Sequence, residues 1–195
     1  MIVSKEGIIN CYNYFEDLSD IADFVIVKKG EQPTPEHETS PYLMLTPEDI
    51  LACSNLNTEV IKSSIAAISK FEEQSGYINN FMLNLLNAYD KDTKRKELLN
   101  LSEYICDKFL SYKKSVSDVI NKMQIIKRKR DLTEQEITEI YNIKETLEKD
   151  DNYNMFQCGI AILLNNKSDY EYFYNKMNKN EKKDFSKFPI VNLLP

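Results

Sequence analysis

Between residues 48 and 188 the sequence contains no proline and only two glycines, Gly76 and Gly159. Proline costs about 3 kcal/mol inside a helix and glycine about 1 kcal/mol, so a span that lacks them permits long helices. Four of the six prolines lie between residues 33 and 47, in a polar connector. The sequence therefore predicts a short N-terminal part, a proline-rich connector and a helical body.

The predicted fold is all-α: a helical bundle or array with long helices and a small N-terminal extended or β-hairpin element. Residues 1–45 are predicted to form an N-terminal helix plus an extended, proline-rich segment. Residues 46–150 form the main helical domain, and 151–195 a helical pair packed on it. Two short apolar runs, 24–27 and 42–45, either pair as a hairpin or pack on helices as extended segments, and both arrangements stay open.

Several helix starts can be read from capping residues. Thr46 precedes Pro47, which fits an N-cap followed by proline at the first helical position. Thr133-Glu134-Gln135-Glu136 is a capping box. Three shorter helices are expected near 152–164, 168–177 and 180–188, with Ser168 and Asn180 as caps.

The longest predicted helix covers residues 93–127, about 50 Å at 1.5 Å per residue. Its apolar residues follow a heptad-like spacing of three and four, with one extra residue between Ile105 and Phe109. Ser115 and Ser117 offer a place where this helix can break.

An apolar seam of this length predicts an interface. A neighbouring helix at 134–148 covers only part of it, and an exposed apolar strip marks a binding surface. A second neighbour at 61–89 covers more, so a wholly internal seam is the open alternative. We expect a protein partner or a homo-oligomer through the 98–126 helix, and the candidate interface residues are Leu101, Ile105, Phe109, Tyr112, Val116, Val119 and Met123.

Charge falls in blocks of alternating sign. Residues 1–60 carry a net charge of −8, residues 91–130 of +7 and residues 131–151 of −6. The positive block ends in Lys127-Arg128-Lys129-Arg130, which suits a helix end, the phosphates of a nucleic acid or the acidic surface of a partner. Because acidic residues follow at once, the helix end is the favoured interpretation.

Catalytic residues are scarce. His37 is the only histidine, which excludes paired-histidine metal sites, and no glycine-rich phosphate loop or nucleophile elbow occurs. Asp90 and Asp92 beside Lys91 can hold Mg²⁺ for phosphodiester chemistry, which makes a metal-dependent nuclease the third hypothesis. Helix capping is the favoured role of these carboxylates. We therefore expect no enzyme activity, no cofactor, no metal and no small-molecule ligand.

Four cysteines lie far apart, and no apolar run approaches the roughly 20 residues of a membrane span. The first residues lack the basic-then-apolar order of a signal peptide. These features predict a cytoplasmic protein without membrane contact. Cys106 and Cys158 lie beside apolar stripes, so both are expected to be buried, free thiols.

Residues 46–65 resemble a helix-turn-helix. Ile50 and Leu51 stand at core positions of the first helix, and Ile61 and Ile65 at those of the second. In that family the second helix reads the major groove of DNA. The resemblance implies a DNA-binding protein as the alternative function, and the candidate nucleic-acid contacts are Thr58, Lys62, Lys127, Arg128, Lys129 and Arg130.

Residues 152–189 resemble a degenerate tetratricopeptide-like helical pair. Gly159 and Ala161 are the small residues of the first helix, Tyr170 and Phe173 lie in the second, and Pro189 ends the unit. The resemblance implies a helical hairpin that binds protein.

Binding is therefore the favoured function. We expect a non-enzymatic adaptor, inhibitor or complex subunit that acts through protein–protein contacts. The chain has 22 lysines but only 3 arginines, as AT-rich codons would give. A small acidic protein of this kind suits host–phage conflict or a toxin–antitoxin system.

Overall fold

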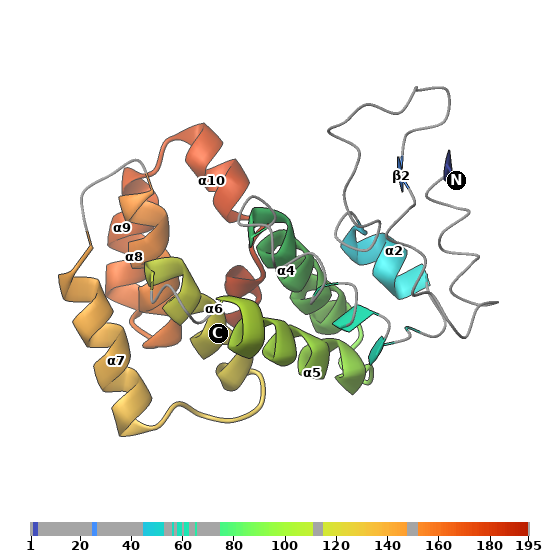
Figure 1. The fold of residues 1–195 in the computed structure, drawn as a ribbon. Coiled ribbons are helices and arrows are strands. Elements are labelled where there is room, and N and C mark those ends of the chain that lie inside the picture. The colour runs from blue at the N-terminus through green and yellow to red at the C-terminus, as the bar shows by residue number, and fades with distance from the viewer. Residues whose placement is uncertain are drawn as a thin grey trace. The chain divides into compact units, whose positions relative to one another are not determined.

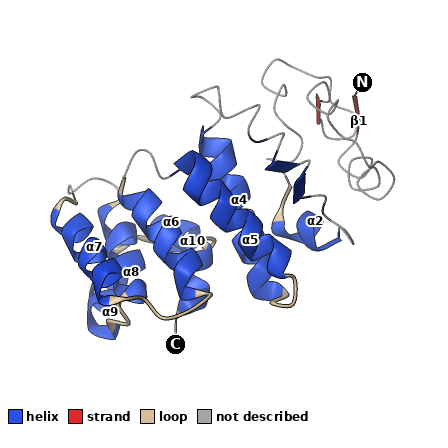
Figure 2. Cartoon of the chain, turned by 60° about the horizontal axis from the view of Figure 1, so that its bottom comes forward, coloured by secondary structure: helices blue, strands red, loops and turns tan. Residues whose placement is uncertain are grey.

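The computed structural model describes residues 2–3, 25–26, 45–52, 56, 58–59, 61–62, 65, 75–110, 115–147 and 152–194. This part of the chain is all-α apart from two short strands, which confirms the predicted fold class (Figures 1 and 2). The chain forms two compact units, Met1–Ile105 (unit 1) and Cys106–Pro195 (unit 2). The division falls inside the range predicted as one domain, 46–150.

The two strands belong to unit 1. β1 (Ile2–Val3) and β2 (Val25–Ile26) pair in parallel, with Ile2 opposite Val25. The sequence did not predict this partner for 24–27. The residues needed for the alternative pairing with 42–45 lie outside the described part, apart from Leu45.

The first described helix of unit 1, α2 (Pro47–Ala52), begins where the sequence predicts. The backbone N–H of Thr46 donates to Asp49 Oδ2 at 2.8 Å, and the N–H of Asp49 donates to Thr46 Oγ1 at 3.3 Å. This reciprocal pair of bonds is a capping box, and it satisfies donors that the first turn leaves unpaired.

α4 (Ser75–Lys91) and α5 (Lys96–Ile105) pack together in unit 1 and are joined by a short turn. Arg95 in this turn donates from Nη1 to the carbonyl of Ile50 at the end of α2, at 2.9 Å. The stripe predicted in α4 is buried, as are the apolar residues of α5: Ile78, Met82, Leu85, Tyr89, Leu98, Leu99, Leu101 and Ile105.

Unit 2 begins with a π-helical segment and continues as a set of short helices. Its elements are η5 (Cys106–Leu110), α6 (Val116–Lys127), α7 (Glu134–Glu145), α8 (Tyr153–Leu163), α9 (Lys167–Lys176), α10 (Lys179–Phe185) and the 3₁₀ helix η6 (Pro189–Leu193). α8 and α9 lie side by side (Figures 1 and 2). They form the helical pair that the sequence predicts.

α8 is the central helix of unit 2. All seven residues from 157 to 163 are buried, so this part of the helix is enclosed on every side. Gly159 brings it close to α6, because a Cβ at this position would lie 3.4 Å from Ile120 Cδ1. The core around α8 contains Val119, Ile120, Met123, Ile140, Cys158, Ile160, Ile162, Leu163, Met177, Phe185 and Ile190.

The prediction of one helix from 93 to 127 is wrong. Ile105 ends α5, and the π-helical segment follows at the position of the extra residue in the heptad pattern. A π-helix accommodates one more residue per turn than the regular spacing does. Ser115 is the N-cap of α6 and forms a capping box with Asp118, which confirms Ser115 as the place where the helix can break.

The broken helix also changes the predicted interface. Leu101 and Ile105 are buried, and Val119 and Met123 lie in the core of unit 2. These four side chains therefore offer no exposed apolar strip. Phe109 and Val116 are half-buried, and Tyr112 lies outside the described residues.

Two of the predicted caps lie two residues too late. Asn166, not Ser168, caps α9, and Asn178, not Asn180, caps α10. Asn178 Oδ1 accepts from the N–H groups of Asn180 and Glu181, at 2.8 and 3.0 Å. The sequence Asn-Lys-Asn-Glu is thus a capping box with asparagine as its first residue.

In the described ranges, no helix is both long and apolar enough to cross a membrane. Cys106 and Cys158 are free thiols and are buried, as the sequence predicts. Burial raises the pKa of Cys158 to about 12.

Candidate functional site

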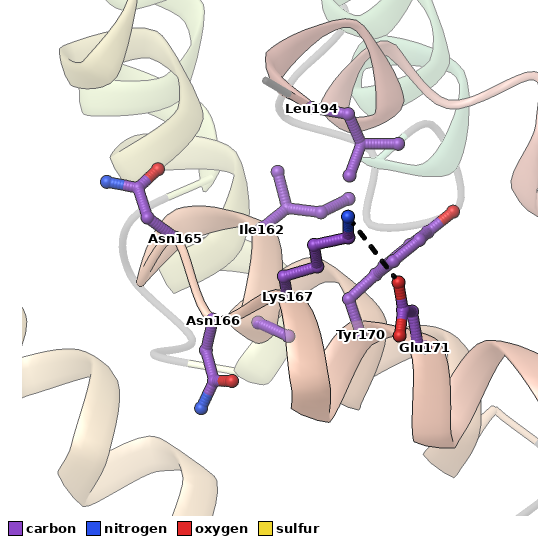
Figure 3. A pocket seen from close by; sticks show the side chains of 8 residues that line it. Ile162, Asn165, Asn166, Lys167, Tyr170, Glu171 and Leu194 are labelled. Atoms are coloured by element: carbon purple, nitrogen blue, oxygen red, sulfur yellow. Dashed lines mark ion pairs between the residues drawn. The ribbon is translucent and has the colours of Figure 1, made fainter.

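A pocket of about 490 Å³ lies at the turn between α8 and α9 (Figure 3). Its buried floor is apolar, and Leu194 forms part of its wall. Lys167 and Glu171 stand at its rim as a loose ion pair, 3.8 Å apart and largely exposed. The lining residues are Ala161, Ile162, Asn165, Asn166, Lys167, Tyr170, Glu171 and Leu194.

The turn beside this pocket is a Schellman motif. Asn165 has a φ of 53°, in the left-handed region that asparagine tolerates better than most residues. Its N–H donates to the carbonyl of Ile162 at 3.2 Å, and the N–H of Asn166 donates to that of Ala161 at 2.8 Å. Asn166 then caps α9 by accepting from the N–H of Asp169. Two consecutive asparagines thus end one helix and start the next.

Lys127 reaches this turn from the end of α6. Its Nζ donates to the carbonyls of Ile162 and Leu163, at 2.9 and 2.8 Å, and to Asn165 Oδ1 at 2.7 Å. Carbonyls at a helix C-terminus have no partner within the helix, and a cation there also suits the helix dipole. Burial lowers the pKa of Lys127, and the carboxylate of Asp131 opposes that effect. Lys127 therefore binds the C-terminal carbonyls of α8, and not those of its own helix, α6.

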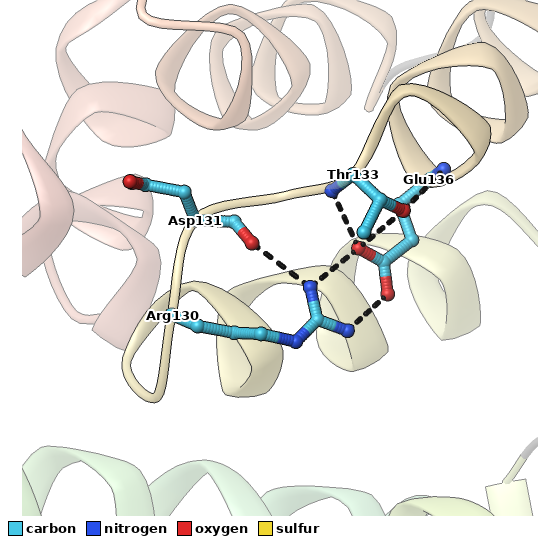
Figure 4. Close-up of polar contacts among 4 residues, drawn as sticks. All are labelled: Arg130, Asp131, Thr133 and Glu136. Atoms are coloured by element: carbon cyan, nitrogen blue, oxygen red, sulfur yellow. Dashed lines mark hydrogen bonds and ion pairs between the residues drawn. The ribbon is translucent and has the colours of Figure 1, made fainter.

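The two arginines of the basic run also have partners inside unit 2. Arg128 donates from Nη1 to the carbonyl of Gln124 at 2.9 Å and from Nη2 to that of Pro189 at 2.7 Å. These bonds tie the end of α6 to η6. Arg130 donates from both terminal nitrogens to Glu136, each at 2.8 Å, and to the carbonyl of Asp131 (Figure 4).

Glu136 joins the end of α6 to the start of α7. Besides Arg130, it accepts from the N–H of Thr133 at 2.8 Å, which completes the predicted capping box. The hydrogen bonds from Arg130 and Thr133 lower the pKa of Glu136 to about 2. Lys127, Arg128 and Arg130, three of the five basic side chains proposed for nucleic-acid contact, thus bind other groups within unit 2.

The helix-turn-helix candidate lies in unit 1. Of the core positions that the resemblance implies, Ile50, Ile61 and Ile65 are buried and Leu51 is half-buried. The turn residue Leu56 is also buried, whereas Asn55 and Asn57 lie outside the described part. Thr58 is half-buried. The ammonium of Lys62 lies 2.6 Å from Glu59 Oε1 and 5.1 Å from the centre of the Tyr104 ring. Both proposed contact residues are therefore partly occupied by local packing.

The structure places the carboxylates proposed for metal binding at the end of α4, where Asp90 lies, and in the turn that follows, where Asp92 lies. Asp92 Oδ1 accepts from the N–H of Lys94 at 3.2 Å, which stabilises the turn between α4 and α5. Within the described ranges, no group of three or more histidine, cysteine, aspartate or glutamate side chains is arranged to hold a metal. His37 lies outside these ranges.

The outer side of α9 carries an exposed aromatic group. Tyr172 is 56% exposed, the largest exposed fraction among the large hydrophobic side chains of the described residues. Lys176 Nζ donates to Tyr172 Oη at 2.6 Å and lies 4.1 Å from the centre of its ring. Phe173 supports Tyr172 edge-on at 5.0 Å and itself meets Tyr153 at 6.0 Å. Packing on both neighbours holds the exposed ring in place.

Lysines without carboxylate partners surround the junction of α9 and α10. We call Lys176, Lys179, Lys182 and Lys183 the α9–α10 lysines. Helix geometry places the last three on one side of α10. Lys182 lies over the ring of Tyr174, 5.0 Å from its centre. No carboxylate of the described residues lies within ion-pair distance of these four ammonium groups.

The carboxylates of the same helices are used elsewhere. Asp169 pairs with Lys144 of α7 at 3.0 Å, and Asp184 pairs with Lys187 at 2.6 Å. The latter contact lowers the pKa of Asp184. Glu181 accepts from the N–H of Asn178 at the start of α10. The α9–α10 lysines therefore form no ion pair with these carboxylates, and sequence analysis missed them because they form no continuous basic run.

Comparison of the chain with protein-family models, with curated proteins and with solved structures found no match. The function is therefore inferred from the residues and contacts described above.

Proposed function

We propose that this chain is a non-enzymatic protein–protein interaction protein, an adaptor, inhibitor or complex subunit. Its binding surface consists of Tyr172 and the α9–α10 lysines, and its partner presents an acidic surface. The observation that carries the proposal is the exposed, packed Tyr172 ring with Lys176 against it, together with three lysines of α10 that form no ion pair with a carboxylate.

Tyrosine suits such a surface because its ring buries a large apolar area at a low cost in side-chain entropy. Phe173 and Lys176 already restrict the ring of Tyr172, so less freedom is lost when a partner binds. The lysines, which form no ion pair with a carboxylate, attract an oppositely charged surface and speed up encounter with it. Together these features favour an acidic protein surface as the ligand.

A protein partner is favoured over nucleic acid by the composition of the surface. It contains lysines but no arginine, the residue that stacks on bases and binds phosphates with two hydrogen bonds. The arginines nearest to it in sequence, Arg128 and Arg130, bind within unit 2. An oligonucleotide is therefore included as a competing ligand in the test.

The test uses fluorescence anisotropy with a fluorescein-labelled decapeptide of glutamate and tyrosine. We expect saturable binding to the wild-type chain and at least tenfold weaker binding to the Lys179→Glu/Lys183→Glu variant. The matched control is Lys94→Glu/Lys108→Glu, which changes the charge equally at two exposed positions elsewhere. Absence of saturable binding, an equal loss in the control, or tighter binding of a (dT)20 oligonucleotide would each refute the proposal.

A further inference from the structure

We propose that the ligand of this surface is a second copy of the chain: the outer face of α7 in one copy binds Tyr172 and the α9–α10 lysines of the other. The inference rests on the function proposed above and names its partner. Both surfaces belong to unit 2, so a single folded unit carries the two halves of the contact.

The outer face of α7 consists of Glu134, Thr138, Tyr141 and Glu145. Their spacing of four, three and four residues places them on one side of the helix. All four are exposed, and Tyr141 is 51% exposed. No lysine or arginine of the described residues lies within ion-pair distance of Glu134 or Glu145. This face therefore combines an exposed ring with uncompensated negative charge.

The opposite side of α7 is the part that holds the helix in unit 2. Ile140 is fully buried there in the core, and Ile143 packs against the same core. Lys144 pairs with Asp169 and so is not available to neutralise the outer face. The outer face thus stays exposed to solvent.

The charges of the two surfaces are complementary. Residues 131–147 contain five carboxylates and one lysine, whereas residues 176–187 contain five lysines and two carboxylates. Each surface also carries one tyrosine that is more than half exposed, Tyr141 or Tyr172. Opposite charges on the two sides give the electrostatic complementarity that steers two protein surfaces together, and aromatic rings are enriched at protein interfaces. The chain itself therefore supplies a partner of the chemistry that its lysine surface requires.

The α7 face and the α9–α10 lysines are different surfaces of the same copy. Each copy can therefore bind one neighbour through its α7 face and a second neighbour through its lysines. Such a contact closes into a dimer or ring, or continues as an open chain, according to the rotation between copies. Light scattering and sedimentation equilibrium distinguish these assemblies. Both report the same association equilibrium, so the proposal does not depend on which assembly forms.

The test is a charge exchange between two variants. Lys179→Glu/Lys183→Glu makes the lysine surface acidic, and Glu134→Lys/Glu145→Lys makes the α7 face basic. In each pair one substitution suits the helix dipole better and the other worse, so the stability of the helix stays nearly constant. Circular dichroism checks that both variants are folded.

We expect the wild-type chain to associate with increasing concentration, and each variant alone to associate at least about tenfold more weakly. Mixing the two variants restores association, because each then meets an oppositely charged face. Raising the salt concentration to about 1 M, where the screening length is about 3 Å, weakens the wild-type assembly. The Lys94→Glu/Lys108→Glu control associates like the wild type.

A wild-type chain that stays monomeric at every concentration would overturn the inference, as would a mixture that fails to associate. If the monomer still binds the acidic peptide through Lys179 and Lys183, the proposed function stands and only the identity of the partner is wrong. If neither the peptide nor a second copy binds, both proposals fail.

Discussion

Replacing Lys127 with methionine tests how unit 2 holds the α8–α9 turn. The ammonium makes three hydrogen bonds of 2.7 to 2.9 Å, two of them to carbonyls at the end of α8. A hydrogen bond from a charged donor contributes about 1.5–3 kcal/mol, and burial of the ammonium offsets part of the sum. We therefore expect Lys127→Met to destabilise the turn by about 2–3 kcal/mol, because methionine keeps the apolar stem and loses only the donors.

Cys158 provides a local assay of this loss. Its thiol is fully buried on α8, and its Sγ lies 3.8 Å from the carbonyl of Tyr170 on α9. Iodoacetamide reaches it only when these helices separate, and peptide mass spectrometry distinguishes it from the other cysteines. A loss of about 2–3 kcal/mol raises the labelling rate about 30- to 160-fold, since each 1.4 kcal/mol is a factor of ten.

Lys122→Met is the matched control, since it lies on the same helix and its side chain makes no hydrogen bond or ion pair with the described residues. We expect its labelling rate to stay within about threefold of the wild type. If Lys127→Met changes the rate by less than about threefold, or if Lys122→Met has the same effect, the ammonium does not hold the turn. The capping argument would then be wrong.

Three further predictions concern single substitutions in unit 2. Glu136→Gln should flatten the pH dependence of stability between about pH 4.5 and 2, measured by acid unfolding: the pKa of Glu136 is lowered from 4.5 to about 2, so its contribution is complete above 4.5 and is lost as the pH falls. A variant with the same acid profile as the wild type would contradict this. Gly159→Ala should raise the free energy of unfolding by up to about 1 kcal/mol, because alanine favours the helix and the flexible Ile120 side chain can accommodate a methyl group. Gly159→Leu, which is too large for this contact, should lower it, and a loss in both variants would disprove the reasoning. Asn165→Ala should cost about 1–2 kcal/mol in urea unfolding, through the left-handed φ and the lost bond from Lys127, and an unchanged midpoint would count against it.

The helical fold could be predicted because helix signals are local. The absence of proline between 48 and 188 permits helices. Thr46 and Thr133 each start a helix, because their hydroxyl oxygen accepts a hydrogen bond from the backbone N–H three residues later. The caps Asn166 and Asn178 follow the same rule with asparagine. Their misplacement came from choosing a later residue and not from any missing signal.

The helix break required more than local signals. The apolar spacing through Ile105 fits one long seam, yet the seam is divided between two units at Cys106. The single extra residue in the heptad pattern was the sign of the π-helical segment. A periodic pattern shows that a face is apolar, but not whether the core or another molecule covers it.

The candidate site was the least predictable part. Lys127 and Asn165 are far apart in sequence, and nothing in the basic run indicates that its first lysine binds the end of another helix. The α9–α10 lysines are spread among polar residues that include carboxylates. Only the structure shows that these carboxylates bind other groups and form no ion pair with the four lysines. Sequence analysis sees the charges, whereas their pairing depends on tertiary contacts.

The attachment of α7 by one fully buried side chain, Ile140, has a consequence for hydrogen exchange. Helices that bury little apolar surface open at low free energy, independently of global unfolding. The amides of α7 should therefore exchange with deuterium before those of α8, which is enclosed on every side from 157 to 163. Two ion pairs also link α7 to the rest of unit 2, Arg130 with Glu136 at its first turn and Lys144 with Asp169 of α9 near its end. Exchange rates in α7 thus report how firmly these contacts and Ile140 hold the helix, without unfolding of the rest of the unit.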